Sequence, residues 1–230
     1  MIGAFSRGFS QLSDPALRRV LIIGLVGSLL IYLAIFLGAF AFVEGKGWLD
    51  SWWLGPLIRF GGTTVLAILS WLMFPAIVTL IVSFFLEPVA KAVEDRYYPG
   101  LAEPRHQQLG EILWITIKFM ALAVVLNLIT LPLVFILIFF PPFNFFVFYA
   151  LNGYLLGREY FELVAHRRME ARGARALRGA FPVRMFLAGV IIALMMTIPV
   201  LNLIAPIVAT AAMVHLVHAW RDDLAREEER

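Results

Sequence analysis

Four stretches of this 230-residue chain contain no Asp, Glu, Lys or Arg, and they cover 20–43, 60–86, 119–157 and 185–220. A chain with 61% hydrophobic and 15% charged residues has too little polar surface to enclose such runs in a soluble domain. The sequence therefore predicts an all-α integral membrane protein, with a single membrane domain over residues 1–230.

The lengths of the runs predict how each one meets the bilayer. About 20 apolar residues cross a hydrocarbon core about 30 Å thick, so 20–43 and 60–86 each fit one tilted transmembrane helix. The runs over 119–157 and 185–220 are too long for one helix and barely long enough for two.

Basic residues predict the orientation, because Lys and Arg beside membrane helices stay on the cytoplasmic side. Of the 19 Lys and Arg residues, only Lys46 and Arg59 lie in the loop 44–59, which is therefore predicted to be external. The segments predicted to be cytoplasmic are 1–19, 87–118, 158–184 and 221–230. Both termini then lie in the cytoplasm, and the two longest runs leave the cytoplasmic side and return to it as helical hairpins.

Short arms predict that these hairpins are re-entrant and only partly inserted. In 185–220, Pro199, Asn202 and Pro206 mark the centre and leave about 14 residues on either side, which reach about 21 Å. In 119–157 the turn is expected at 141–144, where two prolines interrupt the helix. Turns at membrane depth need cover from other protein, so we expect a homo-oligomer.

Two cytoplasmic segments are predicted to extend the fold as helices. One is expected over 87–98, stopped by Pro99 and Gly100, and a longer basic helix is expected over 158–178. The Arg residues of the second helix occur on most of its faces, which indicates a solvated or headgroup-facing helix. They carry no recognisable nucleic-acid reader motif, so nucleic acid is not an expected partner.

The start of the first run has the residues of an anion site. Ser13 and Asp14 are capping residue types, Pro15 suits the first helical turn, and Arg18 and Arg19 follow. Unpaired backbone N–H groups, the positive end of the helix dipole and planar guanidinium groups match an oxyanion such as sulfate. The alternative is that the two arginines only anchor and orient the helix.

Four groups of residues carry a family resemblance over nearly the whole chain. They are Pro15-Ala-Leu-Arg18-Arg19, Leu86-Glu87-Pro88, Asn152-Gly153-Tyr154, and Thr197-Ile-Pro199-Val-Leu-Asn202-Leu203 with Pro206. In their order and placement they resemble the CysZ-type sulfate permease family. The resemblance implies a multi-pass protein of the bacterial inner membrane with two transmembrane helices and two partly inserted hairpins.

The same resemblance implies an oligomer, a hexamer, that admits sulfate for cysteine synthesis. Carried over by position, Arg18 and Arg19 are the expected sulfate ligands. Family members commonly have Gly after the proline where this chain has Ala16. Handling of oxyanions is therefore a firmer expectation than selectivity for sulfate.

Further polar residues lie near the predicted membrane boundary. Ionisable groups there are costly unless they are paired, so these residues are candidates for a polar network that lines the route or locks helices together. The candidates are Glu87, Asn152, Arg158, Glu159 and Asn202. A purely structural role is an open alternative for each of them.

Other function classes have little support in the sequence. No enzyme and no cofactor are expected, because we find no Ser nucleophile with a His base, no HExxH helix and no paired intramembrane carboxylates. His215 and His218 could share a helical face but lack further ligands, so no metal is expected. No Gly-rich phosphate loop occurs, so ATP hydrolysis by this chain is not expected. The remaining alternative is a non-transporting membrane scaffold or assembly protein.

Overall fold

The computed structural model describes residues 1–44 and 55–229, and within them every regular element is a helix. The elements are α1 (Ile2–Ser10), a 3₁₀ turn (Gln11–Ser13), α2 (Pro15–Glu44), α3 (Gly55–Ser83), α4 (Leu86–Tyr97), α5 (Leu109–Leu137), α6 (Pro141–Ala165), α7 (Ala171–Ala180), α8 (Pro182–Thr197) and α9 (Pro199–Glu228). The predicted all-α class is confirmed. Most of the predicted external loop 44–59 lies outside the described residues.

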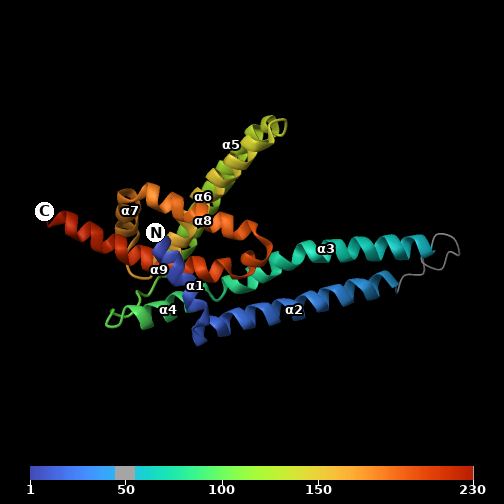
Figure 1. Cartoon of the computed structure of the whole chain (residues 1–230), viewed down its shortest axis with the longest axis horizontal. Helices are drawn as coiled ribbons and strands as arrows, with labels where there is room; N and C mark the ends of the chain where they lie inside the picture. The colour runs from blue at the N-terminus through green and yellow to red at the C-terminus, as the bar shows by residue number, and fades with distance from the viewer. Residues whose placement is uncertain (45–54, 230) are drawn as a thin grey trace.

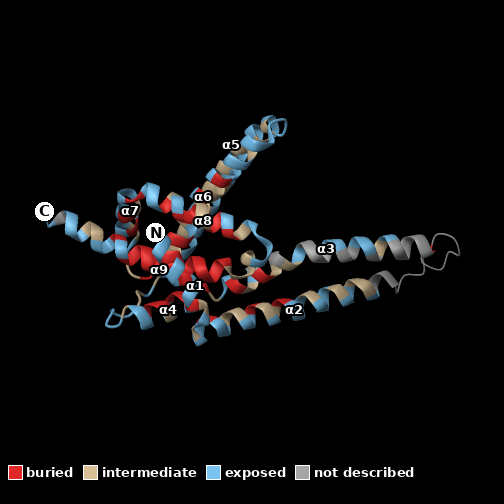
Figure 2. Cartoon of the chain, in the orientation of Figure 1, coloured by how far each residue is buried: buried red, intermediate tan, exposed pale blue. Residues whose placement is uncertain are grey.

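Two helical arms extend from one packed body (Figure 1). Helices α2 and α3 lie side by side and form the first arm, and α5 projects in a different direction together with part of α6. The body is built around α9, which contacts α1, α3, α4, α6, α7 and α8. Buried residues gather in this body, whereas α5 buries none of its residues (Figure 2). The isolated chain therefore leaves this apolar helix uncovered, as a membrane helix requires.

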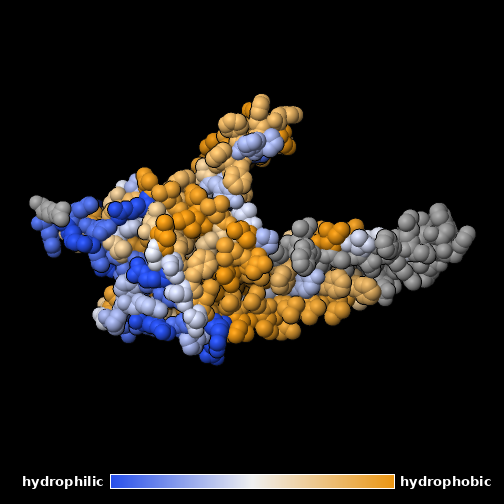
Figure 3. All heavy atoms as spheres, viewed as in Figure 1, coloured by the Kyte–Doolittle hydropathy of each residue, from blue (hydrophilic) through white to orange (hydrophobic). Residues whose placement is uncertain are grey.

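Three helices in the described part of the chain are long and apolar enough to cross a membrane. Their spans are Pro15–Ala41, Leu109–Leu137 and Pro199–Glu227. A bent pair, α7 followed by α8, turns by 90° and is either a broken span or a re-entrant loop. Apolar surface covers the α2 and α5 arms, and hydrophilic surface gathers around α4, α7 and the end of α9 (Figure 3). The long apolar helices and the separation of apolar from hydrophilic surface confirm the prediction of a membrane protein.

In each hairpin, a proline begins the second helix. The sequence instead predicts that the prolines mark the turn at the centre of the hairpin. Pro141 starts α6 directly after the turn that ends α5, and Pro199 starts α9 after the extended residue Ile198. Proline is tolerated in a first turn because its missing N–H has no partner there in any case. Helix α9 begins at Pro199 and continues through Pro206, so the part of it that lies inside the run 185–220 is longer than the expected arm of about 14 residues. Re-entrant insertion of either hairpin stays a prediction.

The two predicted cytoplasmic helices have different outcomes. Helix α4 confirms that the first segment is helical, while its cytoplasmic location stays a prediction. Gly100, with a positive φ of 88°, follows the end of this helix. The prediction of one basic helix over 158–178 is wrong, because α6 ends at Ala165 and α7 begins only at Ala171. The turn between them directs Arg167 and Arg168 toward α4, where both bind the same carboxylate.

Three glycines bring the two hairpins into close contact. A Cβ atom on Gly189 of α8 would collide with the carbonyl oxygen of Gly153, and one on Gly157 would collide with the carbonyl oxygen of Met185. Among the described residues, α6 and α8 contact each other more extensively than any other pair of helices. Glycine is required here because the backbones approach too closely for any side chain.

Candidate functional site

Asp14 organises the first turn of α2. Its Oδ1 atom accepts a hydrogen bond from the Ala16 backbone N–H at 3.1 Å, which is the geometry of a helix cap. Its Oδ2 atom accepts a hydrogen bond from Arg96 Nη1 at 2.6 Å, and this ion pair ties α4 to the start of α2. Asp14 is therefore the cap, while the Ser13 hydroxyl donates to the Ser10 carbonyl instead.

Arg18 and Arg19 lie exposed on this turn, and among the described residues neither guanidinium has a hydrogen bond or an ion pair. The neighbouring Leu17 is only 1% exposed and packs into the core, which leaves the two arginines on the outside. The backbone contributes less than expected to this site. Pro15 has no N–H and the N–H of Ala16 is already capped, so an anion here depends mainly on the guanidinium groups.

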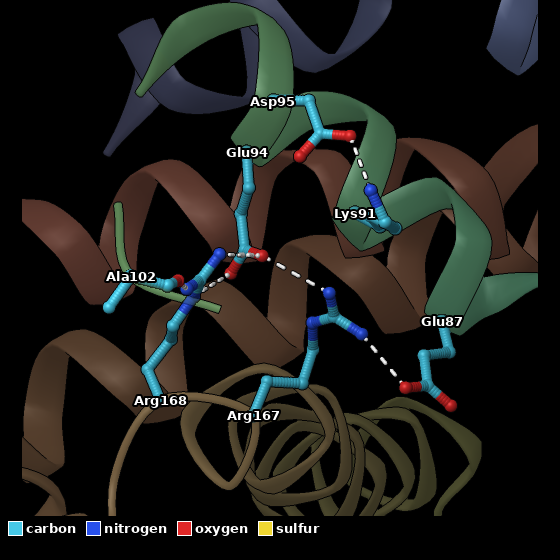
Figure 4. Close-up of polar contacts among 7 residues, drawn as sticks. All are labelled: Glu87, Lys91, Glu94, Asp95, Ala102, Arg167 and Arg168. Atoms are coloured by element: carbon cyan, nitrogen blue, oxygen red, sulfur yellow. Dashed lines mark hydrogen bonds and ion pairs between the residues drawn. The ribbon is translucent and has the colours of Figure 1, made fainter. Parts of the chain in front are cut away.

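A buried cluster of charges joins α4 to the turn after α6 (Figure 4). Glu94 is at its centre, with a side chain that is 0% exposed. It accepts hydrogen bonds from Arg168 Nε at 3.0 Å and Nη2 at 2.6 Å, and from Arg167 Nη2 at 3.1 Å. Arg167 Nη1 also donates to Glu87 at 2.9 Å, and Arg168 donates to the carbonyl oxygen of Ala102.

The ion pairs of this cluster hold α4 against the turn after α6. A carboxylate without access to water is costly unless its oxygens are bound, and two guanidinium groups satisfy both oxygens of Glu94. The sequence reasoning named Glu87 but missed Glu94, Arg167 and Arg168. The signal was available, because Glu87 and Glu94 are seven residues apart and so lie on one face of a helix.

The other predicted polar residues do not form one network. Arg158 Nε donates to Glu162 Oε1 at 2.7 Å, one helical turn along α6, and Glu162 also pairs with Arg178 of α7. Asn152 donates within α6 to the Phe148 carbonyl oxygen at 2.9 Å. Asn202 is half-buried in the first turn of α9, at the tip of the second hairpin. Asn152 and Asn202 are thus absent from the charged cluster.

A half-open cavity of about 550 Å³ lies where α4, the first turns of α5 and the last turns of α6 meet. Glu87, Glu159 and Glu162 line it together with Arg105, His166 and Arg167. Arg105 donates to both carboxylate oxygens of Glu111 at 2.9 and 2.6 Å. Its backbone N–H also donates to the Arg167 carbonyl at 2.9 Å, which holds the segment before α5 against the cluster.

Burial lowers the pKa of His166 below its ordinary value, and the charges of Glu162 and Glu111 offset only part of this shift. The imidazole is therefore neutral near pH 7. Its Nδ1 atom is buried and has no hydrogen-bond partner in the described part of the chain. One polar atom beside the cavity is thus buried without a hydrogen bond among the described residues.

His215 of α9 is held between two other helices and is not arranged for metal binding. Its Nε2 atom lies 2.7 Å from Gln11 Nε2, and its Nδ1 atom lies 2.8 Å from the Tyr98 hydroxyl. Both ring nitrogens are therefore in use. His218 stacks on Tyr98 with ring centroids 4.1 Å apart. Within the described residues, no group of three or more His, Cys, Asp or Glu side chains could hold a metal ion.

A comparison with protein families identifies one that matches most of the chain. The family described as "Sulfate transporter CysZ/Etoposide-induced protein 2.4" matches residues 4–206. The matched region includes Arg18, Arg19, the charged cluster around Glu94 and both hairpin turns. No curated protein is similar enough in sequence to be counted as a relative.

Proposed function

The chain belongs to the family of sulfate transporter CysZ and etoposide-induced protein 2.4, and from this premise we propose that it is an oxyanion permease of a bacterial inner membrane. Its proposed substrate is sulfate, and its proposed role is to supply sulfate for assimilation and cysteine synthesis. At the level of the family, a role like that of a membrane sulfate transporter is supported, and such a family is one of transporters rather than enzymes.

One observation supports a location for the anion site. Among the described residues, Arg18 and Arg19 are exposed and unpaired at the start of a membrane helix. The nearest carboxylate along the chain, Asp14, is already bound to Arg96 and to the Ala16 N–H. Two free guanidinium groups on one helical turn offer several N–H donors in a planar arrangement that suits a tetrahedral oxyanion. The position favours anions further because the helix dipole is positive at this end.

Sulfate would pass through this protein down its own concentration gradient. The sequence holds no phosphate-binding loop of the ATPase kind, so ATP hydrolysis by this chain has no support. Consumption of sulfate inside the cell would keep the gradient inward. The hairpin turns at Ile198 and before Pro141 need cover from protein if they lie at membrane depth, which supports assembly as a homo-oligomer. The placement of both termini in the cytoplasm is supported by the basic residues beside the apolar runs.

The direct test is uptake of radiolabelled sulfate into liposomes that contain the purified protein. We expect saturable uptake that the double variant Arg18→Ala, Arg19→Ala loses. The matched control is Arg172→Ala, Arg175→Ala, which removes two other exposed arginines from α7 and should leave uptake unchanged. Equal loss in both double variants would point to general surface charge, and no uptake above empty liposomes would favour a scaffold or assembly role.

A further inference from the structure

Helix α5 carries a side-chain amide midway along an uncovered apolar arm (Figure 1). Asn127 is exposed, and α5 buries none of its residues. Near the start of the arm, Lys118 Nζ lies 4.5 Å from the centroid of the Trp114 ring, and these residue types are typical of a membrane interface. Asn127 lies about 14 Å from Lys118 along the helix, and about as far from its end at Leu137. The amide is therefore deep in the part of α5 that lipid surrounds.

The hydrogen bonds of Asn127 are only partly made. Its Nδ2 atom donates to the Ala123 carbonyl oxygen at 2.8 Å, one turn back along α5. Among the described residues, the second N–H of this amide has no acceptor and its Oδ1 atom has no donor. Polar atoms without a partner are costly in hydrocarbon, and lipid tails supply neither donor nor acceptor. The missing partner of Asn127 must therefore be a polar group at the same depth.

Asn127 belongs to a stripe of exposed residues with the spacing of a heptad repeat. Successive members are four or three residues apart, so they lie on one side of α5 over about 27 Å. The members are Leu113, Ile117, Met120, Val124, Asn127 and Leu131. The apolar members are 50–61% exposed. The stripe ends before Pro132, the proline inside this helix.

Helix α6 packs on another side of α5 and leaves this stripe free. Arg158 of α6 lies over the ring of Phe119, 5.9 Å from its centroid. Phe119, Leu122 and Leu126 form the half-buried side of α5. Their positions on the helix differ from those of the stripe. Within the described part of the chain, nothing covers Asn127 and its apolar neighbours.

We propose that the stripe pairs with the same stripe of a second copy of this chain, with the two Asn127 amides hydrogen-bonded to each other. Copies inserted in the same direction are related by an axis along the membrane normal, so equal residues meet at equal depth. An amide is self-complementary there, because each Nδ2 donates to the other Oδ1. An apolar stripe alone is satisfied by lipid tails, which are as apolar as Leu, so the amide selects protein. The inference rests on the homo-oligomer of the proposed function and names the surface that forms it.

The chain contains no cysteine, so disulfide formation between single introduced cysteines tests the pairing in native membranes. Val124→Cys and Leu131→Cys lie in the stripe on either side of Asn127. Ile129→Cys is the matched control, because Ile129 is 67% exposed on the opposite side of α5 at a similar depth. On oxidation with copper phenanthroline, we expect disulfide-linked dimers of both stripe variants at about five times the yield of the control, since the two Cα atoms must approach within about 7 Å. Equal yields in all three variants, or no dimer in any of them, would overturn the proposal.

Two further changes test the amide itself in the Val124→Cys chain. Asn127→Leu should lower the dimer yield about tenfold, whereas Asn127→Gln keeps an amide and should retain most of it. The fold should tolerate both changes, because Asn127 is exposed and bonds only to its own helix. An unchanged yield in Asn127→Leu would refute the role of the amide pair.

Sulfate uptake separates this proposal from the proposed function. Uptake by a protein whose stripe cysteines form no disulfide would overturn the pairing and leave the permease standing. Stripe disulfides that depend on Asn127, in a protein without uptake above empty liposomes, would support the pairing and remove the permease.

Discussion

Glu94 and Arg168 form a bidentate pair inside the body of the protein, with Nε 3.0 Å from one carboxylate oxygen and Nη2 2.6 Å from the other. Glu94 lies on α4, and Arg168 lies in the turn that separates α6 from α7. The pair therefore connects α4, which follows the first arm, to the turn that follows α6, across 74 positions of sequence. Because Arg167 binds the same carboxylate, the geometry of this joint is fixed by three side chains.

Removing the central carboxylate should destabilise the body strongly. Glu94→Ala leaves two guanidinium groups, 4% and 9% exposed, without their shared partner. Loss of one member of a buried ion pair typically costs about 3–5 kcal/mol. We expect a loss of that order in the free energy of unfolding, measured by denaturant titration in detergent. Asp95→Ala is the control, since its pair with Lys91 is about 60% exposed and should contribute at most about 1 kcal/mol.

The helical membrane class could be predicted from the sequence because it depends on composition and run length, which are local properties. Charge-free runs mark the apolar helices whatever their tertiary contacts are. The joint around Glu94 depends on a different kind of information. Arg167 and Arg168 stand in a basic run that reads as one solvated helix, and only the fold shows that the helix breaks at Ala165 and sends both side chains inward.

The proposed anion site was also only partly predictable. The residue types at Asp14, Arg18 and Arg19 indicate a capped helix start with free charges, and the structure has both features. The partner of Asp14 was not predictable, because Arg96 lies 82 positions away. Pairings between distant helices require a known packing arrangement, which hydropathy and charge counts do not contain.

The close contact of the hairpins predicts a sharp difference between two glycines. Gly189→Ala places a methyl group against the Gly153 carbonyl, so α6 and α8 must separate. Overpacking of this kind costs about 1–3 kcal/mol, and we expect the melting temperature to fall accordingly. Gly110→Ala is the counterpart in α5, where the new methyl group meets open space and should leave stability equal or slightly higher. A similar decrease in both variants would contradict the proposed packing.

Asp14 offers a test of the anion site that does not remove either arginine. Asn caps a helix about as well as Asp, so Asp14→Asn should preserve α2 while removing a negative charge next to Arg18. It also releases Arg96 from its 2.6 Å ion pair. We expect sulfate to bind about fivefold more tightly, measured by isothermal titration at low salt. Asp95→Asn is the control, and equal gains in both variants would show that the effect is one of net charge alone.

His166 predicts how stability changes with pH. Burial holds the pKa of this imidazole below its ordinary value in the folded protein, so the unfolded chain binds the proton more readily. The contribution of the neutral His166 imidazole to the free energy of unfolding is therefore fully present above pH 6.5. It is lost as the pH falls through and below that value. We expect the urea midpoint of the unmodified protein to decrease between pH 7.5 and pH 5.5, and to decrease less in His166→Gln. His106→Gln, which alters an exposed imidazole in the same cavity lining, should retain the full pH dependence. Identical pH profiles for His166→Gln and the unmodified protein would exclude His166 as the source.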